Sequence, residues 1–103
     1  MMMQATISAE DVLRDLYQAE AALRWFEQKY GLLSDVFYRL YRQGRLRDED
    51  PQEIQQYVEW AGWYEIYQER HTRYDQAIEQ RLESLSAPVS LFDLHLSQLK
   101  VSA

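Results

Sequence analysis

The sequence contains no cysteine, which excludes disulfides, thiol nucleophiles and cysteine-ligated metal sites. That absence fits a reducing compartment, and we expect a cytoplasmic protein. Only two prolines and three glycines occur in 103 residues, a composition that favours long helices. No apolar run is long enough to span a bilayer, and the first residues lack the basic start and apolar core of a signal peptide. We therefore expect neither a membrane segment nor a signal peptide.

The net charge of −6 opposes a general phosphate-binding surface, so the chain as a whole is not expected to bind nucleic acid. The hydrophobic fraction of 47% and the aromatic fraction of 14% are typical of a folded chain. At this length we expect one helical domain over residues 1–87. Residues 88–103 then form a C-terminal tail that could bind a partner.

Start and stop signals predict a first helix over residues 9–30 and a short second helix from Ser34 to about Gln43. Ser8 can cap the first helix, and a glycine directly follows each of the two, at Gly31 and Gly44. The first helix carries an apolar seam with alternating steps of four and three, typical of helix packing. The seam residues are Val12, Leu16, Ala19, Leu23, Phe26 and Tyr30.

A long helix is predicted from Pro51 to about residues 84–87. Asp50 can cap it, proline suits the first helical position, and Glu53 can reach back to the cap. Pro88 disfavours helical geometry at the residue before it. One stripe of this helix is mostly aromatic. It consists of Tyr57, Trp60, Tyr64, Tyr67, His71, Tyr74, Ile78 and Leu85.

The tail fits a short helix capped by Ser90, although residues 94–97 also fit a strand; we favour the helix. The predicted fold is therefore all-α, an antiparallel helical hairpin with a short intervening helix. The first and long helices would measure about 33 Å and about 50 Å, so part of the long helix would overhang. Either the tail or a second chain must cover the apolar overhang. We expect a homodimer, paired through the long helix as a dimeric bundle, or an obligate partner. The overhanging residues are Tyr74, Ile78, Leu82 and Leu85.

Large aromatic and leucine side chains on the long helix and in the tail are the candidate interaction residues, because such side chains anchor many interfaces. They are Trp60, Trp63, Tyr64, Tyr67, Phe92, Leu96 and Leu99.

A second candidate surface combines arginines with Tyr38 and Tyr41, as in sites that stack bases and contact phosphates. Its arginines are Arg39, Arg42, Arg45 and Arg47. The alternative interpretation is local pairing of these arginines with Asp35 and with the acidic run at residues 48–50.

No catalytic or metal-ligating pattern is present in the sequence. There is no nucleophile turn of the Gly-x-Ser-x-Gly type, and no glycine-rich phosphate loop. His71 and His95 are the only histidines, and neither is part of a His-x-x-x-His or Glu-x-x-His pair on one helix face. We expect no enzymatic activity, no metal and no cofactor.

Three stretches resemble small all-helical, antitoxin-like proteins of prokaryotic operons. They are residues 29–38 (KYGLLSDVFY), residues 44–46 (GRL) followed by acids, and residues 58–67 (VEWAGWYEIY). The family carries a Lys-Tyr-Gly-Met-Ser motif, a Phe-Tyr pair, a Gly-Glu-Leu turn and a Glu-Trp-Ala-x-x-Tyr helix. The resemblance covers residues 10–82, and Arg45 and Arg47 replace expected acids. It rests on residues that have the character of structural positions: Tyr30, Gly31, Phe37, Gly44, Leu46, Trp60, Ala61 and Tyr64.

The resemblance implies a protein that binds and neutralises a small toxin-like partner encoded beside it. We expect a protein-interaction module of this kind, with a basic partner because opposite charge speeds encounter. Either the aromatic helix or the tail would cover the partner's active surface. The alternative function is a nucleic-acid-binding regulator that uses the Arg39 to Arg47 region.

Overall fold

The computed structural model describes residues 9–85 and 88–102, with side chains described as far as Ser97. Its helices are α1 (Ala9–Tyr30), α2 (Ser34–Arg42), α3 (Pro51–Glu83) and α4 (Leu91–Ser102). The described residues contain no strand, so the all-α prediction is confirmed and the tail is helical. No helix in this part of the chain combines the length and apolarity that a membrane span requires.

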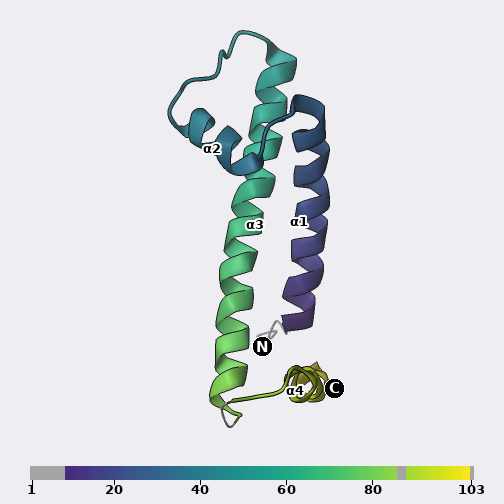
Figure 1. Cartoon of the computed structure of the whole chain (residues 1–103). Helices are drawn as coiled ribbons and strands as arrows, with labels where there is room; N and C mark the ends of the chain where they lie inside the picture. Colours follow the sequence, from purple (N-terminus) through teal and green to yellow (C-terminus); the bar gives the residue numbers. More distant parts are fainter. Residues whose placement is uncertain (1–8, 86–87, 103) are drawn as a thin grey trace, which may run out of the picture.

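Helices α1 and α3 lie side by side and run in opposite directions (Figure 1). The predicted seam of α1 is buried, except for Tyr30, because this stripe faces α3. On α3 only Trp60 and Ala61 are fully buried. Buried residues that come from different helices therefore meet near one end of the helix pair, where α2 packs. This core cluster consists of Leu23, Phe26, Phe37, Trp60 and Ala61.

Glycines end α1 and α2, as the sequence predicts. Gly31 has φ +63° and Gly44 has φ +68°, in the left-handed region that glycine adopts without steric cost. The Gly31 N–H donates to the Glu27 carbonyl at 2.8 Å, and the Arg45 N–H donates to the Leu40 carbonyl at 3.0 Å. These bonds satisfy carbonyls at the helix ends and turn the chain sharply on both sides of α2.

Helix α3 begins as predicted and ends slightly earlier. The Asp50 carboxylate accepts the Gln52 N–H at 2.9 Å, and Pro51 occupies the first helical position. Glu53 differs from the prediction, because its carboxylate accepts the Tyr57 hydroxyl at 3.3 Å and does not cap the helix. The helix ends at Glu83, just before the predicted range of 84–87.

Helix α4 crosses the end of the helix pair, close to the first turn of α1 and the last turns of α3 (Figure 1). The Ser90 hydroxyl accepts the Asp93 N–H at 3.0 Å, so Ser90 caps this helix as predicted. The apolar side chains of the expected overhang are half-buried within the single chain. The tail of the same chain therefore packs against this end of the molecule.

Candidate functional site

An aromatic stack at the junction of α1, α2 and α3 forms the centre of the molecule. The Trp60 and Phe37 rings are parallel, with their centroids 4.0 Å apart, and the Phe26 ring stacks against Trp60 at 5.3 Å. Trp60 is 2% exposed and Phe37 is 1% exposed. Burial of aromatic side chains of this size stabilises the junction.

A polar network lies at the edge of the aromatic stack. The Trp60 indole N–H donates to Ser34 Oγ at 2.9 Å, and Ser34 Oγ donates to Glu27 Oε2 at 2.7 Å. The same carboxylate oxygen accepts the Ser34 backbone N–H at 3.0 Å. Glu27 thereby supplies the cap at the start of α2, because the N-cap residue Leu33 has no side-chain acceptor. The sequence predicts Ser34 at a helix start but does not predict its contacts with Glu27 and Trp60.

A pocket of about 360 Å³ adjoins this network and opens to solvent between α1, the start of α2 and α3. Its walls combine apolar, aromatic and charged side chains. They come from Glu20, Leu23, Arg24, Glu27, Leu33, Ser34, Asp35, Tyr64 and Tyr67. Burial, with a smaller contribution from the nearby Asp35 carboxylate, raises the pKa of the Tyr64 phenol. Two of the predicted interaction residues, Tyr64 and Tyr67, therefore line this pocket.

The remaining predicted interaction residues fall into different environments. Trp60 is in the core, because α2 folds over the part of α3 that carries it, so it belongs to no surface available to a partner in the folded chain. Trp63 is half-buried. Phe92 and Leu96 are exposed on α4, and the side chain of Leu99 lies outside the described residues.

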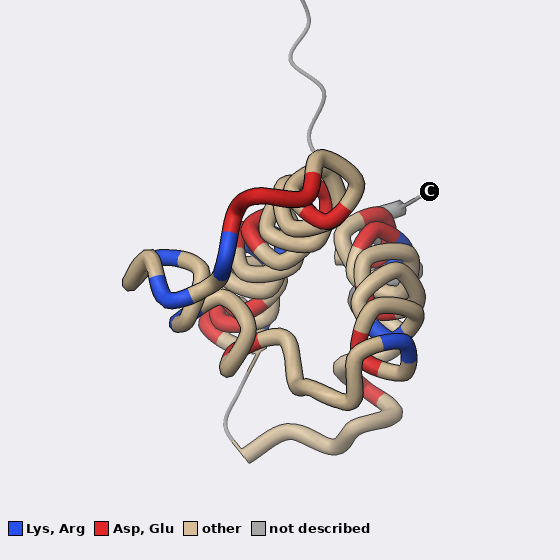
Figure 2. The backbone as a smooth tube through the Cα atoms, turned by 90° about the horizontal axis from the view of Figure 1, so that it is seen from above, with Lys and Arg blue, Asp and Glu red and all other residues tan. Residues whose placement is uncertain are grey.

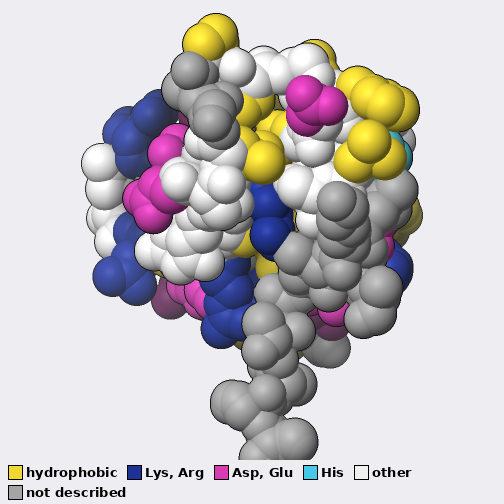
Figure 3. All heavy atoms as spheres, turned by 90° about the horizontal axis from the view of Figure 1, so that it is seen from below, with side chains coloured by type: hydrophobic (Ala, Val, Ile, Leu, Met, Phe, Trp, Pro, Cys, Tyr) yellow, Lys and Arg dark blue, Asp and Glu magenta, His cyan; other side chains and the backbone are white. Residues whose placement is uncertain are grey.

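Apolar side chains are exposed on the underside of the molecule, where α4 lies (Figure 3). Leu91 is 84% exposed and Phe92 is 68% exposed, whereas Leu94 is half-buried. Among the side chains of α4 that the structure describes, apolar residues therefore lie both toward the rest of the chain and toward solvent.

The predicted arginine surface is exposed on α2 and on the loop that follows, next to the acidic run leading into α3 (Figure 2). The sequence predicts ion pairs between these arginines and nearby acids. Within the described residues, one such pair forms, between Arg47 and Glu49 at 3.9 Å. The two tyrosines of this surface are engaged elsewhere. Tyr41 stacks on Phe37, and the Tyr38 hydroxyl donates to Glu65 at 2.7 Å. Both rings are half-buried against aromatic neighbours of the same chain.

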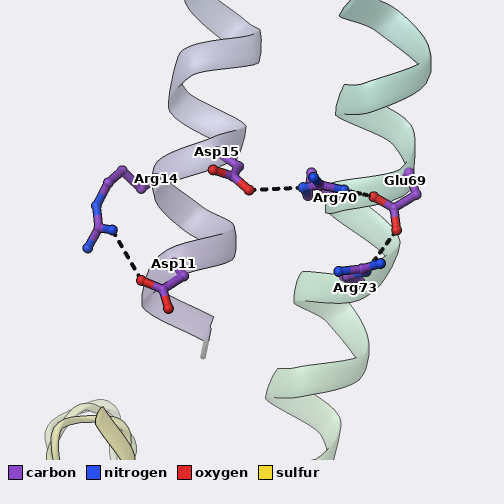
Figure 4. A network of polar contacts seen from close by, with 6 residues as sticks. All are labelled: Asp11, Arg14, Asp15, Glu69, Arg70 and Arg73. Atoms are coloured by element: carbon purple, nitrogen blue, oxygen red, sulfur yellow. Dashed lines mark hydrogen bonds and ion pairs between the residues drawn. The ribbon is translucent and has the colours of Figure 1, made fainter. Parts of the chain in front are cut away.

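Ion pairs follow the helices and connect two of them (Figure 4). Arg70 of α3 donates to Asp15 of α1 at 2.9 Å and also pairs with Glu69. The Glu69 carboxylate pairs in turn with Arg73 at 2.8 Å. These side chains are partly exposed, so the network contributes modestly to stability. Its geometry supports a role in aligning α1 against α3.

The histidines are both exposed, and His71 pairs with Asp75 at 3.4 Å. Isolated histidines in an apolar stripe are usually packed, but the position of His71 on α3 faces solvent. Within the part of the chain that the structure describes, no three acidic, histidine or cysteine side chains come together as they would around a metal ion.

No protein-family model, curated protein or solved structure matches this chain. The antitoxin-like resemblance therefore rests on the sequence patterns alone. The fold and the surfaces described above supply the physical basis for a function.

Proposed function

We propose that this chain is a protein-interaction module that binds and neutralises a small basic partner in the manner of an antitoxin. The observation that carries the proposal is the outer face of α4, where Leu91, Phe92 and Leu96 are exposed on one short helix. Exposed clusters of large apolar side chains commonly mark surfaces that a second protein covers. The net charge of −6 favours a partner of opposite charge.

The proposed mechanism is occlusion of the partner by an apolar helix. The outer face of α4 would supply the buried contacts, and acidic side chains around it would supply long-range attraction. Neutralisation in this way needs no catalytic residue on this chain. It requires only that the bound helix cover the surface by which the partner acts.

A pull-down with the tagged chain from its source cells, with and without nuclease, tests the proposal. We expect a small basic protein that remains bound after nuclease treatment and co-elutes with the chain on a sizing column. Phe92→Ser should reduce its recovery, whereas Gln76→Ser, an exposed change on α3, should not. Recovery of the chain alone from wild-type and variant samples would contradict the proposal.

The exposed arginines favour a second candidate function, a regulator that binds nucleic acid through the Arg39 to Arg47 region. Exposure of four arginines around α2 is the observation that supports it. Replacing Arg39 and Arg42 with glutamine should then weaken binding and reduce its salt dependence. Absence of any mobility shift with DNA or RNA at low salt would exclude this function.

We also propose that two copies associate into a dimeric bundle. Trp25 and Val58 are among the large apolar side chains that remain exposed on α1 and α3, and helices with such residues are often paired in oligomers. Sedimentation equilibrium measures the mass directly. A dimer that Trp25→Ser dissociates would support the proposal, and a monomer at all concentrations would refute it.

A further inference from the structure

The pocket between α1, α2 and α3 has the features of a site for an extended cation. Its volume of about 360 Å³ falls in the range of ligand-binding pockets. It is partly apolar, because the buried Leu23 and the 63% exposed Leu33 both line it. Such side chains can pack against the methylene stem of a long side chain.

Tyrosine rings form the wall that α3 contributes. The Tyr64 and Tyr67 rings stack on each other with centroids 6.5 Å apart, and both residues line the pocket. The face of a tyrosine ring carries negative charge and attracts a guanidinium or ammonium group placed over it. This wall is therefore suited to the charged head of an arginine or lysine.

Carboxylates surround the pocket on the sides that α1 and α2 contribute. Glu20 and Glu27 come from α1 and Asp35 from α2, against the cation Arg24. These acids line the pocket from two different helices, so its negative charge is distributed over more than one side. A distributed charge of this sign suits a cation that enters lengthwise better than a compact ion.

Two of the three acids have a structural role, and the third does not. Glu27 caps α2 through Ser34, and the Asp35 carboxylate accepts the Val36 N–H in the first turn of α2, where the helix dipole favours acids. In the described part of the chain, the half-buried Glu20 side chain forms no hydrogen bond or ion pair. Substitution of Glu20 therefore tests a binding role of the pocket without removing a contact that holds the fold.

We propose that this pocket receives one arginine or lysine side chain of the partner protein. The inference rests on the proposed function, since it identifies a group of the basic partner that this chain recognises. The cation would lie against the tyrosine wall formed by Tyr64 and Tyr67. Its stem would lie along Leu33, and Glu20 and Asp35 would face its charge. Glu27 remains bonded to Ser34 and contributes its charge from the side of the pocket.

A titration with a blocked Gly-Gly-Arg-Gly-Gly peptide, followed by amide chemical shifts, tests the pocket without the partner. A matched peptide with citrulline at the centre keeps the shape and removes the charge. We expect the arginine peptide to shift the amides of Glu20, Ser34 and Tyr64, and the citrulline peptide to leave them unchanged. Equal shifts with both peptides, or none with either, would overturn the proposal.

Two substitutions at the pocket, one that removes a negative charge and one that removes a positive charge, provide the second test. Glu20→Gln should weaken binding of the arginine peptide about two- to fivefold, and Arg24→Gln should strengthen it by a similar factor, as for partly exposed charges. Glu79→Gln, on an exposed part of α3 outside the pocket, should have no effect. If Glu20→Gln and Glu79→Gln behave alike, the charge acts over the whole surface and the pocket is not the site.

The two proposals fail in different ways. Capture of a partner whose affinity is the same for the wild-type chain and for Glu20→Gln would overturn the pocket and leave the proposed function intact. Specific binding of the arginine peptide in the pocket, with no protein captured from cells, would support the pocket and contradict the neutralising function.

Discussion

The indole N–H of Trp60 donates to the hydroxyl of Ser34 across 2.9 Å, and this bond joins the middle of α3 to the first residue of α2. Ser34 is 3% exposed, so neither group has ready access to water. Because the hydroxyl also donates to Glu27, one buried oxygen connects three helices. The position of α2 on the helix pair depends on this arrangement together with the aromatic stack.

Ser34→Ala should lower the free energy of unfolding by about 1–3 kcal/mol, because it leaves the Trp60 N–H buried without an acceptor. Urea unfolding followed by tryptophan fluorescence measures the change. Thr72→Ala, an exposed substitution on α3, should stay within about 0.5 kcal/mol of the wild type.

A double-mutant cycle with Trp60→Phe isolates the bond between these two residues. Phenylalanine keeps an aromatic ring against Phe37 and removes the N–H donor. The double variant should lose less stability than the sum of the two single variants, since either change alone breaks the same bond. Strict additivity would show that the two side chains contribute independently.

The helix boundaries were predictable because their signals are local. Gly31 and Gly44 end helices, and Asp50 with Pro51 begins one, through bonds that span only a few residues. The α1 seam was predictable as well, because one stripe of a helix can be read from spacing alone. For the same reason the sequence predicted a helical tail with Ser90 as its cap.

The candidate site was less predictable because it depends on contacts between distant residues. Trp60 lies in the same stripe as Tyr64 and Tyr67, and spacing cannot tell which of the three α2 will cover. No sequence pattern singles out Glu27, because its carboxylate meets the start of α2 only after the turn at Gly31 brings the chain back. The pocket follows from these tertiary contacts and has no sequence motif.

Two phenylalanine substitutions should separate stability from binding. Phe37→Ala removes a ring that is 1% exposed and stacked on Trp60, and it should cost about 3–5 kcal/mol. Phe92→Ala removes a ring that is 68% exposed and should change stability by less than about 0.5 kcal/mol. Urea denaturation of both variants provides the comparison.

The same pair of variants bears on the proposed function. Phe92→Ala should reduce capture of the protein partner while the fold is retained, because its ring lies on the outer face of α4. A Phe92→Ala variant that unfolds as readily as Phe37→Ala would mean that α4 contributes to the core of the single chain. That result would remove the argument for a free apolar face.

Glycine-to-alanine changes at two positions should shift the free energy of unfolding in opposite directions. Gly62 lies inside α3, where an added methyl group would meet no neighbouring atom, so alanine should stabilise the helix by about 0.5–1 kcal/mol. Gly31 also has open space around it, but its φ of +63° is unfavourable for alanine. Gly31→Ala should therefore destabilise the protein by about 1–2 kcal/mol.

Thermal unfolding monitored by circular dichroism is sufficient to rank these glycine variants. Because neither methyl group meets another atom, packing contributes equally little at both sites, and the comparison isolates backbone conformation. Two changes of the same sign would contradict the assignment of Gly31 to a left-handed turn.

Stability should decline at alkaline pH because several tyrosine phenols are more easily ionised in the unfolded chain. Burial is the main cause that raises the pKa of Tyr30, Tyr57 and Tyr64 above the ordinary tyrosine value. The pKa of Tyr38 is also raised, mainly by its hydrogen bond to Glu65. As the pH rises through the ordinary tyrosine range, the unfolded chain loses these protons first, so the free energy of unfolding falls. Below the unfolded pKa the full stabilisation is present.

Urea unfolding at a series of pH values across this range measures the decline, and Tyr38→Phe tests one contribution to it. The variant removes the proton that Tyr38 shares with Glu65, so its stability should fall less steeply with pH than that of the wild type. Glu65→Gln should also flatten the profile, because the amide carries no charge to oppose the phenolate. Identical slopes for the wild type and both variants would show that the Tyr38–Glu65 bond is not maintained in solution.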